Sequence, residues 1–158
     1  MRLPKVVEYA LRSMAHLATK PMGSALSASN LSKETGIPNA FLSKVMRRLV
    51  LAKLVESRKG HGGGFSLTRA PSEIRFREIL TAVDYDLDPE RCAFGWDDCD
   101  AGAPCPLHPA WSLMKDSFAD WANHTTLAEV DPTLEKSRRA KKGPKPDDSE
   151  SLGGVSQV

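Results

Sequence analysis

A length of 158 residues fits a single domain with a tail, and a composition of 41% hydrophobic and 27% charged residues allows a small core to be buried. The apolar runs fall far short of the about 18 residues that indicate a membrane-spanning helix, which argues against a membrane protein. The opening Met1-Arg2-Leu3-Pro4-Lys5 leads directly into an amphipathic pattern without the apolar stretch of a signal peptide. We therefore expect a cytoplasmic protein.

Charge is divided unevenly along the chain. Residues 1–80 contain fourteen Lys and Arg against five Asp and Glu, whereas residues 81–135 contain two against twelve. Residues 136–158 return to six against three. The basic first half favours contact with a polyanion such as nucleic acid, and the acidic second half indicates a different function for that part of the chain.

The first half of the chain predicts three helices in succession. Apolar residues recur at three- and four-residue steps over residues 5–19, which is typical of an amphipathic helix. Ser27 is placed to cap a short second helix that ends at Gly36, and Asn39 is placed to cap a third helix that runs to about Ala52. A short helix, a turn that contains glycine and a second helix together form a helix-turn-helix arrangement.

A hairpin follows directly after the third helix. Residues 54–58 and 65–68 predict two strands, joined by the glycine-rich turn 59–64. This order is typical of a winged helix, so the predicted fold class is mainly α, with residues 1–83 as a winged helix-turn-helix DNA-binding domain with a two-stranded wing. A fourth helix over about 75–83 completes it. Beyond it we expect a cysteine-rich loop at 84–108, a long dimerisation helix region at 109–130 and a disordered tail at 131–158.

Polar and basic side chains lie opposite the apolar face of the third helix, where a recognition helix needs them to reach base edges and phosphates. In the wing, two basic residues stand beside a glycine-rich tip, and glycine allows close approach of backbone to phosphate. An isolated basic helix is usually just a solvated face, but the preceding turn and the following wing favour DNA. The predicted DNA-binding residues are Asn39, Ser43, Lys44, Arg47, Arg48, Arg58, Lys59, Gly62 and Gly63.

The three cysteines all lie within fourteen residues. With a following histidine, Cys92, Cys99, Cys105 and His108 form the pattern C-x6-C-x5-C-x2-H. An odd number of cysteines without an export signal argues against a disulfide framework. Thiolate and imidazole ligands suit zinc, copper(I) and iron–sulfur clusters, and the spacing alone does not distinguish among them. A metal-free thiol sensor, in which one of these cysteines oxidises, is a further possibility.

The last predicted helix begins near Pro109 and carries a stripe of large apolar residues. Trp111, Met114, Phe118 and Trp121 follow one another at spacings of three, four and three. A small winged helix has limited core to receive two tryptophans, so the stripe favours pairing with a second chain, although packing on its own domain is the alternative.

An enzyme is not expected. The sequence shows no Ser/His/Asp constellation with supporting context, no phosphate-binding loop and no pair of catalytic carboxylates.

Over residues 1–130 the chain resembles the IscR/NsrR-type winged helix-turn-helix transcriptional regulators of bacteria. The resemblance runs from the DNA-binding half through the cysteines to the end of the last predicted helix. It rests on Met1-Arg2-Leu3, Leu31…Gly36-Ile37…Leu42…Leu49, Gly60-x-Gly62-Gly63-Gly64-Phe65, Ile79-x-x-Ala82-Val83-Asp84, Cys105-x-x-His108-x-x-Trp111 and Leu127-x-Glu129-Val130.

The resemblance implies a regulator that binds palindromic promoter DNA as a homodimer paired through the long helix. It also implies an iron–sulfur cluster on Cys92, Cys99, Cys105 and His108, expected to be [2Fe–2S], with [4Fe–4S] or zinc as alternatives. Some members instead take the fourth ligand from a carboxylate near the start of the first helix of the partner subunit. Here Glu8, with Arg12 one turn later, stands at that place, and an ordinary helical ion pair is the competing interpretation.

Overall fold

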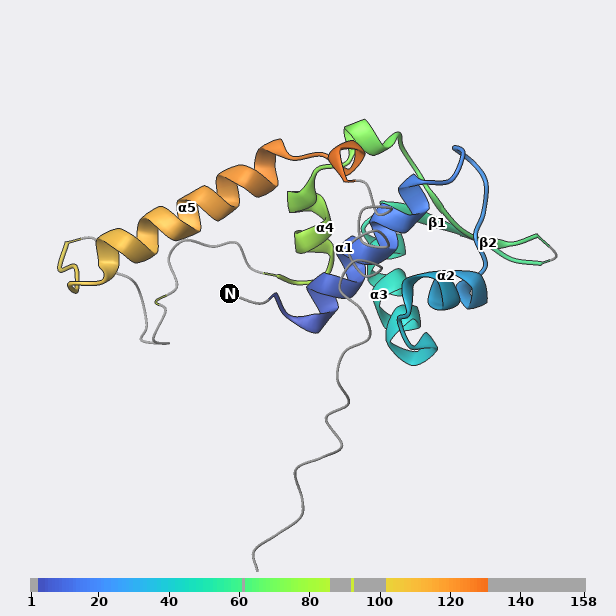
Figure 1. The fold of residues 1–158 in the computed structure, drawn as a ribbon, viewed down its shortest axis with the longest axis horizontal. Helices are drawn as coiled ribbons and strands as arrows, with labels where there is room; N and C mark the ends of the chain where they lie inside the picture. Colours follow the sequence, from blue (N-terminus) through green and yellow to red (C-terminus); the bar gives the residue numbers. More distant parts are fainter. Residues whose placement is uncertain (1–2, 61, 86–91, 93–101, 131–158) are drawn as a thin grey trace, which may run out of the picture.

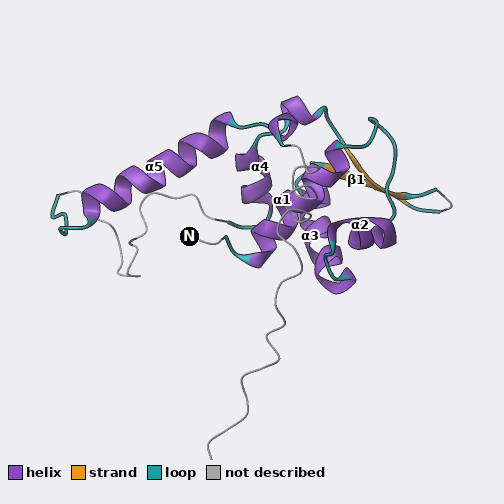
Figure 2. Ribbon diagram, in the orientation of Figure 1, coloured by secondary structure: helices purple, strands orange, loops and turns teal. Residues whose placement is uncertain are grey.

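The computed structural model describes residues 3–60, 62–85, 92 and 102–130. Their elements form one helical body from which the last helix runs outward (Figures 1 and 2). The predicted fold class is confirmed: mainly α, with a two-stranded antiparallel wing. In chain order the elements are α1 (Lys5–Ala18), α2 (Ala28–Thr35), α3 (Asn39–Leu51), β1 (Val55–Arg58), β2 (Gly64–Leu67), η1 (Pro71–Glu73), α4 (Phe76–Ala82), α5 (His108–His124) and η2 (Leu127–Glu129).

The two helices of the helix-turn-helix, α2 and α3, are capped differently at their N-termini. The Ser27 hydroxyl accepts a hydrogen bond from the backbone N–H of Asn30 at 3.2 Å, so the predicted cap of α2 is confirmed. The predicted cap of α3 is wrong. Pro38 occupies the N-cap position, and Asn39 is the first helical residue without a capping side-chain bond. The Pro38 carbonyl accepts the first amides of α3, from Phe41 and Leu42, both at 3.0 Å.

The wing is joined to the segment that precedes α2. Strands β1 and β2 pair in antiparallel register, with Val55 opposite Leu67 and Glu56 opposite Ser66. On the outer side of β2, Leu26 and Phe65 exchange two backbone hydrogen bonds of 2.9 Å each. This additional bridge was not predicted, and it fixes the base of the wing against the helix-turn-helix.

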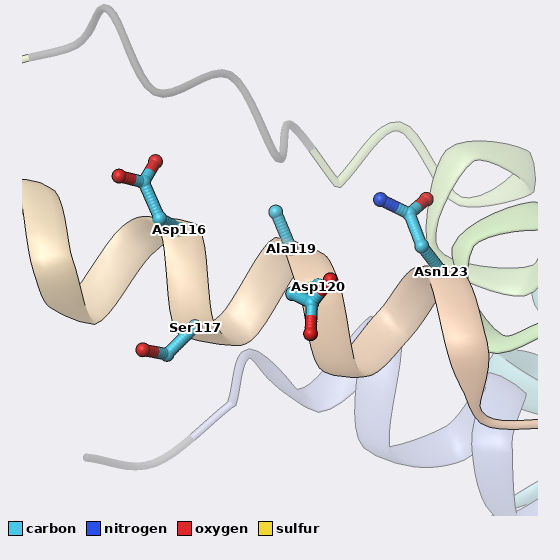
Figure 3. Close-up of a pocket in the computed structure, with 5 residues that line it drawn as sticks. All are labelled: Asp116, Ser117, Ala119, Asp120 and Asn123. Atoms are coloured by element: carbon cyan, nitrogen blue, oxygen red, sulfur yellow. The ribbon is translucent and has the colours of Figure 1, made fainter.

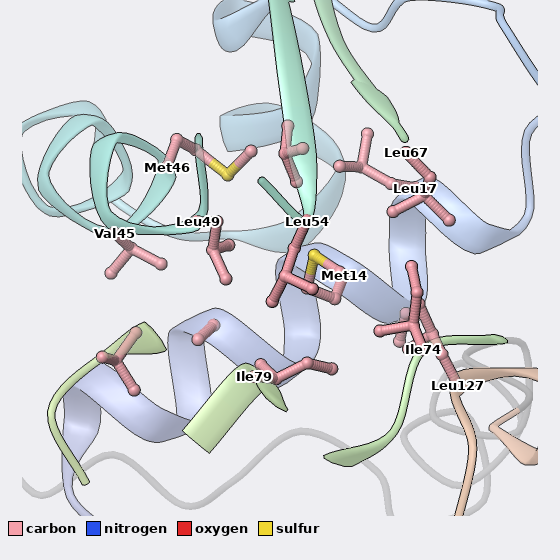
Figure 4. Packing of buried hydrophobic residues seen from close by; sticks show 14 of the residues in the cluster. Met14, Leu17, Val45, Met46, Leu49, Leu54, Leu67, Ile74, Ile79 and Leu127 are labelled. Atoms are coloured by element: carbon pink, nitrogen blue, oxygen red, sulfur yellow. The ribbon is translucent and has the colours of Figure 1, made fainter. Parts of the chain in front are cut away.

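A single apolar core gathers side chains from every helix of the body (Figure 4). Met14 of α1, Leu49 of α3 and Ile79 of α4 are completely buried. The segment after α5 returns to this core: Leu127 is fully buried, its N–H donates to the Ile74 carbonyl at 2.8 Å, and a second backbone bond joins Phe76 to Thr125 at 3.0 Å. The C-terminal end of α5 is therefore anchored to the body.

The described residues include no helix that is long and apolar enough to cross a membrane.

Candidate functional site

The exposed side of α3 carries most of the predicted DNA-binding residues. Burial of Leu42, Val45, Met46 and Leu49 fixes the orientation of the helix, which leaves Asn39, Ser43, Lys44 and Arg47 exposed. Ser43 donates its hydroxyl to the Asn39 carbonyl at 2.9 Å. Neither Lys44 nor Arg47 forms an ion pair within the part of the chain that the structure describes. Their charges are therefore available to an anionic partner.

Arg48 is oriented differently from its neighbours on α3. Its Nη1 donates to the Val83 carbonyl at 2.9 Å and lies 3.2 Å from the Asp84 carboxylate. Both acceptors follow α4, where Asp84 adopts a left-handed conformation with φ of 58°. The structure thus places the predicted DNA contact Arg48, which is itself exposed, in a bond between α3 and the end of α4.

Three basic residues at four-residue steps, two on α1 and Lys20 just after its end, contact the last turn of α2. Arg12 donates to the Thr35 carbonyl at 3.4 Å, and Lys20 donates to Glu34 at 3.1 Å. His16 also contacts the Glu34 carboxylate. These hydrogen bonds, first that of His16 and then that of Lys20, lower the pKa of Glu34 below its usual 4.5. The contacts orient the turn that leads into α3.

In the wing, the two predicted basic contacts lie in different environments. Both are exposed, but Arg58 donates to Glu56 at 2.8 Å and to the Gly23 carbonyl at 3.3 Å, whereas Lys59 forms no ion pair among the residues that the structure describes. Glycine is required at position 63, because a Cβ there would lie 2.3 Å from the Arg58 carbonyl oxygen. Gly62 is exposed at the tip, with a φ of 78°.

Two of the four predicted metal ligands lie on one turn. The His108 N–H donates to the Cys105 carbonyl at 2.9 Å, so both residues stand at the beginning of α5, which starts at His108 and has Pro109 in its first turn. Cys105 and Cys92 are half-buried, and neither is part of a disulfide among the described residues. Cys99 lies outside the described residues, and within those residues no group of three His, Cys, Asp or Glu side chains gathers as for a metal.

The alternative ligand Glu8 is occupied by basic residues of its own helix. Its carboxylate accepts hydrogen bonds from Lys5 at 3.1 Å and from Arg12 at 2.5 Å. The helical ion pair expected as the competing interpretation is therefore present. Metal ligation by Glu8 would have to share its carboxylate oxygens with these contacts.

Toward the C-terminal end of α5 the apolar stripe packs against its own domain, whereas other parts of it are exposed. Phe118 packs edge-on against Tyr85 at 6.2 Å between ring centroids, and Trp121 lies 5.0 Å from Phe76. Trp121 and Met114 nevertheless remain 42% and 40% exposed. The packing alternative thus holds for part of the stripe.

Two further exposed side chains enlarge this surface and were missed by sequence reasoning. Leu113 is 69% exposed and Leu107 is 53% exposed. Leu107 could have been found, because it stands four residues before Trp111 and continues the stripe by one turn. Leu113 lies beside the stripe rather than on it, so the periodicity gives no signal for it.

A polar hollow of about 510 Å³ lies along another side of α5 (Figure 3). Within it, the Asn123 amide oxygen accepts a hydrogen bond from Arg77 at 2.9 Å. None of its residues belongs to the predicted site. The lining residues are Asp116, Ser117, Ala119, Asp120 and Asn123.

Comparison with known proteins resolves the family. The family described as "Rrf2: Iron-dependent Transcriptional regulator" matches residues 3–131. The chain belongs to the Rrf2 family. It is accordingly a DNA-binding transcriptional regulator of this family and not an enzyme.

Relatives of this Rrf2 protein include IscR regulators. The chain is 32% identical to the HTH-type transcriptional regulator IscR of Serratia proteamaculans over an alignment of 130 residues. This alignment covers 82% of this chain and 79% of that protein. The chain is equally identical to IscR of Escherichia coli O1:K1, over 82% of this chain and 80% of that one.

Solved structures share the fold. CymR of B. subtilis, the global cysteine regulator, superposes with a TM-score of 0.70 at 20% identity, over 82% of this chain and 95% of that one. IscR of T. potens superposes with a TM-score of 0.65 at 19% identity, over 92% and 93% of the two chains. The winged helix and the helix that follows it are therefore shared across this set.

Proposed function

We propose that this Rrf2 protein binds promoter DNA under the control of an iron–sulfur cluster held by Cys92, Cys99, Cys105 and His108. In this proposal residues 1–83 bind DNA, residues 84–108 hold the cluster and residues 109–130 pair two subunits. The observation that carries it is the turn at the start of α5, where the Cys105 carbonyl accepts the His108 N–H at 2.9 Å. This turn places a thiol and an imidazole three residues apart on a structured element.

The donor set fits the proposed group chemically. Cys92 and Cys105 are both half-buried and outside any disulfide, as thiolate ligands need to be. Three thiolates and one imidazole suit a [2Fe–2S] cluster, and a cluster supplies a centre whose charge changes with its redox state. The same four donors suit zinc, which would be redox-inert and structural. A metal-free thiol switch is the remaining alternative.

The surroundings of these residues link them to both functional parts of the fold. His108 begins α5 and Cys105 lies in the turn just before it, and the exposed apolar residues of α5 form the proposed dimer surface. Cys92 follows the end of α4, where Arg48 of the recognition helix contacts Val83 and Asp84. In this proposal a change in the positions of the ligand residues alters the spacing of the two recognition helices, provided that it stabilises one arrangement over the other.

The proposed DNA complex follows from the exposed face of α3. Asn39 and Ser43 lie in its first turns, which enter the major groove, and Lys44 and Arg47 are placed for phosphates or base edges. A two-fold dimer must find half-sites one helical turn or a multiple apart, so the expected target is a palindrome. A small rotation between subunits would then weaken binding.

The first experiment purifies the protein without oxygen and measures its visible absorption with its iron, sulfide and zinc contents. The proposal expects visible bands and roughly equal iron and sulfide, lost in Cys105→Ala and reduced in His108→Ala. His124→Ala is the matched control, because His124 is an exposed histidine at the other end of α5. A colourless protein with stoichiometric zinc would contradict the cluster, and metal-free protein would favour the thiol switch. Loss of iron in Glu8→Ala but not in His108→Ala would transfer the fourth ligand to Glu8.

The dimer is tested separately by sedimentation. Leu113→Glu places a charge in the exposed apolar surface of α5 and should convert dimer to monomer, with helical content unchanged. Ala119→Glu, on the side of the same helix that faces the polar hollow, is the control. A wild-type chain that sediments as a monomer at micromolar concentration would refute the pairing.

A further inference from the structure

The outer face of the wing contains a fixed network around a carboxylate. Glu56 and Arg58 stand two residues apart on β1 and therefore on the same face of the sheet. Arg58 Nη2 donates to Glu56 Oε1 at 2.8 Å. Ser66, directly opposite on β2, donates its hydroxyl to the same oxygen at 2.9 Å. One carboxylate oxygen thus receives bonds from both strands.

This network holds the carboxylate in place. Ser66 is 2% exposed, so its hydroxyl cannot turn to water and its bond to Glu56 is retained. The bond from Ser66, which lies directly opposite in the strand register, therefore restricts the rotamers of the 42% exposed Glu56 side chain. An ordinary exposed ion pair between two flexible side chains lacks such a constraint.

The same network draws Arg58 toward the segment before α2. Its second amino group, Nη1, donates to the Gly23 carbonyl at 3.3 Å, so the guanidinium is bound at two points within the chain. Lys59, the next residue, is exposed and has no ion-pair partner among the residues that the structure describes. The two neighbouring cations of the wing therefore differ in their availability.

We propose that Glu56 is a positioning residue that withholds Arg58 from DNA, so that Lys59 is the wing residue that contacts phosphate. The proposal rests on the DNA-binding function proposed above and adds a determinant of its strength. A phosphate that approached Arg58 would have to share a guanidinium that already donates to Glu56 and to Gly23. It would also come close to the Glu56 carboxylate, which the Ser66 hydroxyl holds beside Arg58, and like charges at short range repel.

The test is the salt dependence of DNA binding, because each phosphate that a cation neutralises adds about 0.9 to the slope of log K against log[salt]. The full-length protein first selects its site from random duplexes, and binding to that duplex is then measured from 50 to 200 mM salt. Glu56→Gln keeps an acceptor for Ser66 but removes the charge, and it should steepen the slope by about 0.9 per subunit. The affinity of Glu56→Gln relative to that of the wild-type protein should then fall about 3.5-fold per subunit as the salt rises from 50 to 200 mM.

The double-mutant cycle isolates the pair. Arg58→Ala alone should leave the slope unchanged, Lys59→Ala should make it shallower by about 0.9 per subunit, and Arg58→Ala should abolish the effect of Glu56→Gln. Glu73→Gln, which removes one exposed carboxylate outside the wing, is the control for net charge.

Two results would overturn the proposal: a shallower slope in Arg58→Ala alone, or an unchanged slope in Glu56→Gln. Failure of the wild-type protein to select any duplex would instead refute the DNA-binding function on which the proposal rests. The two failures are therefore distinguishable.

Discussion

Replacement of Gly64 by alanine should separate the wing from the helix-turn-helix. A Cβ at Gly64 would lie 2.3 Å from the Leu26 carbonyl oxygen and 2.7 Å from the Ser27 nitrogen. Both neighbours are backbone, so they cannot move aside as a flexible side chain would. The residue also has a φ of +152°, which a residue with a Cβ rarely adopts. Strand β2 must therefore move away from Leu26.

The cost follows from the bonds at that position. Movement of β2 breaks the two backbone hydrogen bonds between Leu26 and Phe65, both 2.9 Å long. At about 1 kcal/mol for each bond and about 1–2 kcal/mol for backbone strain, Gly64→Ala should lower the free energy of unfolding by about 3 kcal/mol. This is a large part of the about 5–15 kcal/mol by which proteins of this kind are stable.

Urea unfolding followed by circular dichroism measures this change, with Gly62→Ala as the matched control. Gly62 also has a positive φ, +78°, but a Cβ there would meet nothing within 4 Å. Its replacement should cost only the left-handed conformation, about 1–2 kcal/mol. If the two variants lose the same free energy within about 0.5 kcal/mol, the close approach at Leu26 contributes nothing and the reasoning is wrong.

Three further predictions concern the body of the fold. Ile79→Ala removes a fully buried side chain and should cost about 2–5 kcal/mol in the same assay. Arg48→Met should lower stability by about 1 kcal/mol through loss of its bond to Val83, without changing the salt dependence of DNA binding; a shallower slope would show that Arg48 contacts DNA. Glu34→Gln should lower the urea midpoint more at pH 6 than at pH 3. The hydrogen bond from His16 lowers the pKa of Glu34, so the stabilisation exists above its unfolded value near 4.5 and is lost as pH falls through the folded value; equal differences at both pH values would contradict this.

Periodicity and capping residues predict most elements of the body. The step of three and four between buried residues of α3 identifies its core face, and the hydroxyl of Ser27 predicts the start of α2. The glycine-rich turn between two short apolar runs predicts the wing. These signals act between residues that are close in sequence, which is why they can be read without a structure.

Contacts between distant segments are the part that the sequence does not predict. The Leu26–Phe65 bridge depends on a single residue that has no strand pattern around it. The helical wheel places Arg48 on an exposed flank, but its bond to Val83 depends on how α4 packs against α3. For the predicted ligands, the sequence places Cys105 and His108 on one turn, while the assembly of all four remains a prediction because Cys99 lies outside the described residues.

Leu127 connects the last described turn of the chain with the first helix, because it belongs to the same core as Val7 and Met14. During synthesis, the helix-turn-helix leaves the ribosome well before this residue does. Until Leu127 has been synthesised, it cannot shield the apolar core surface beside Ile74 from water. The body can therefore complete its core only after α5 has been made, so the order of translation delays a finished DNA-binding body until the helix proposed to pair the subunits is already present.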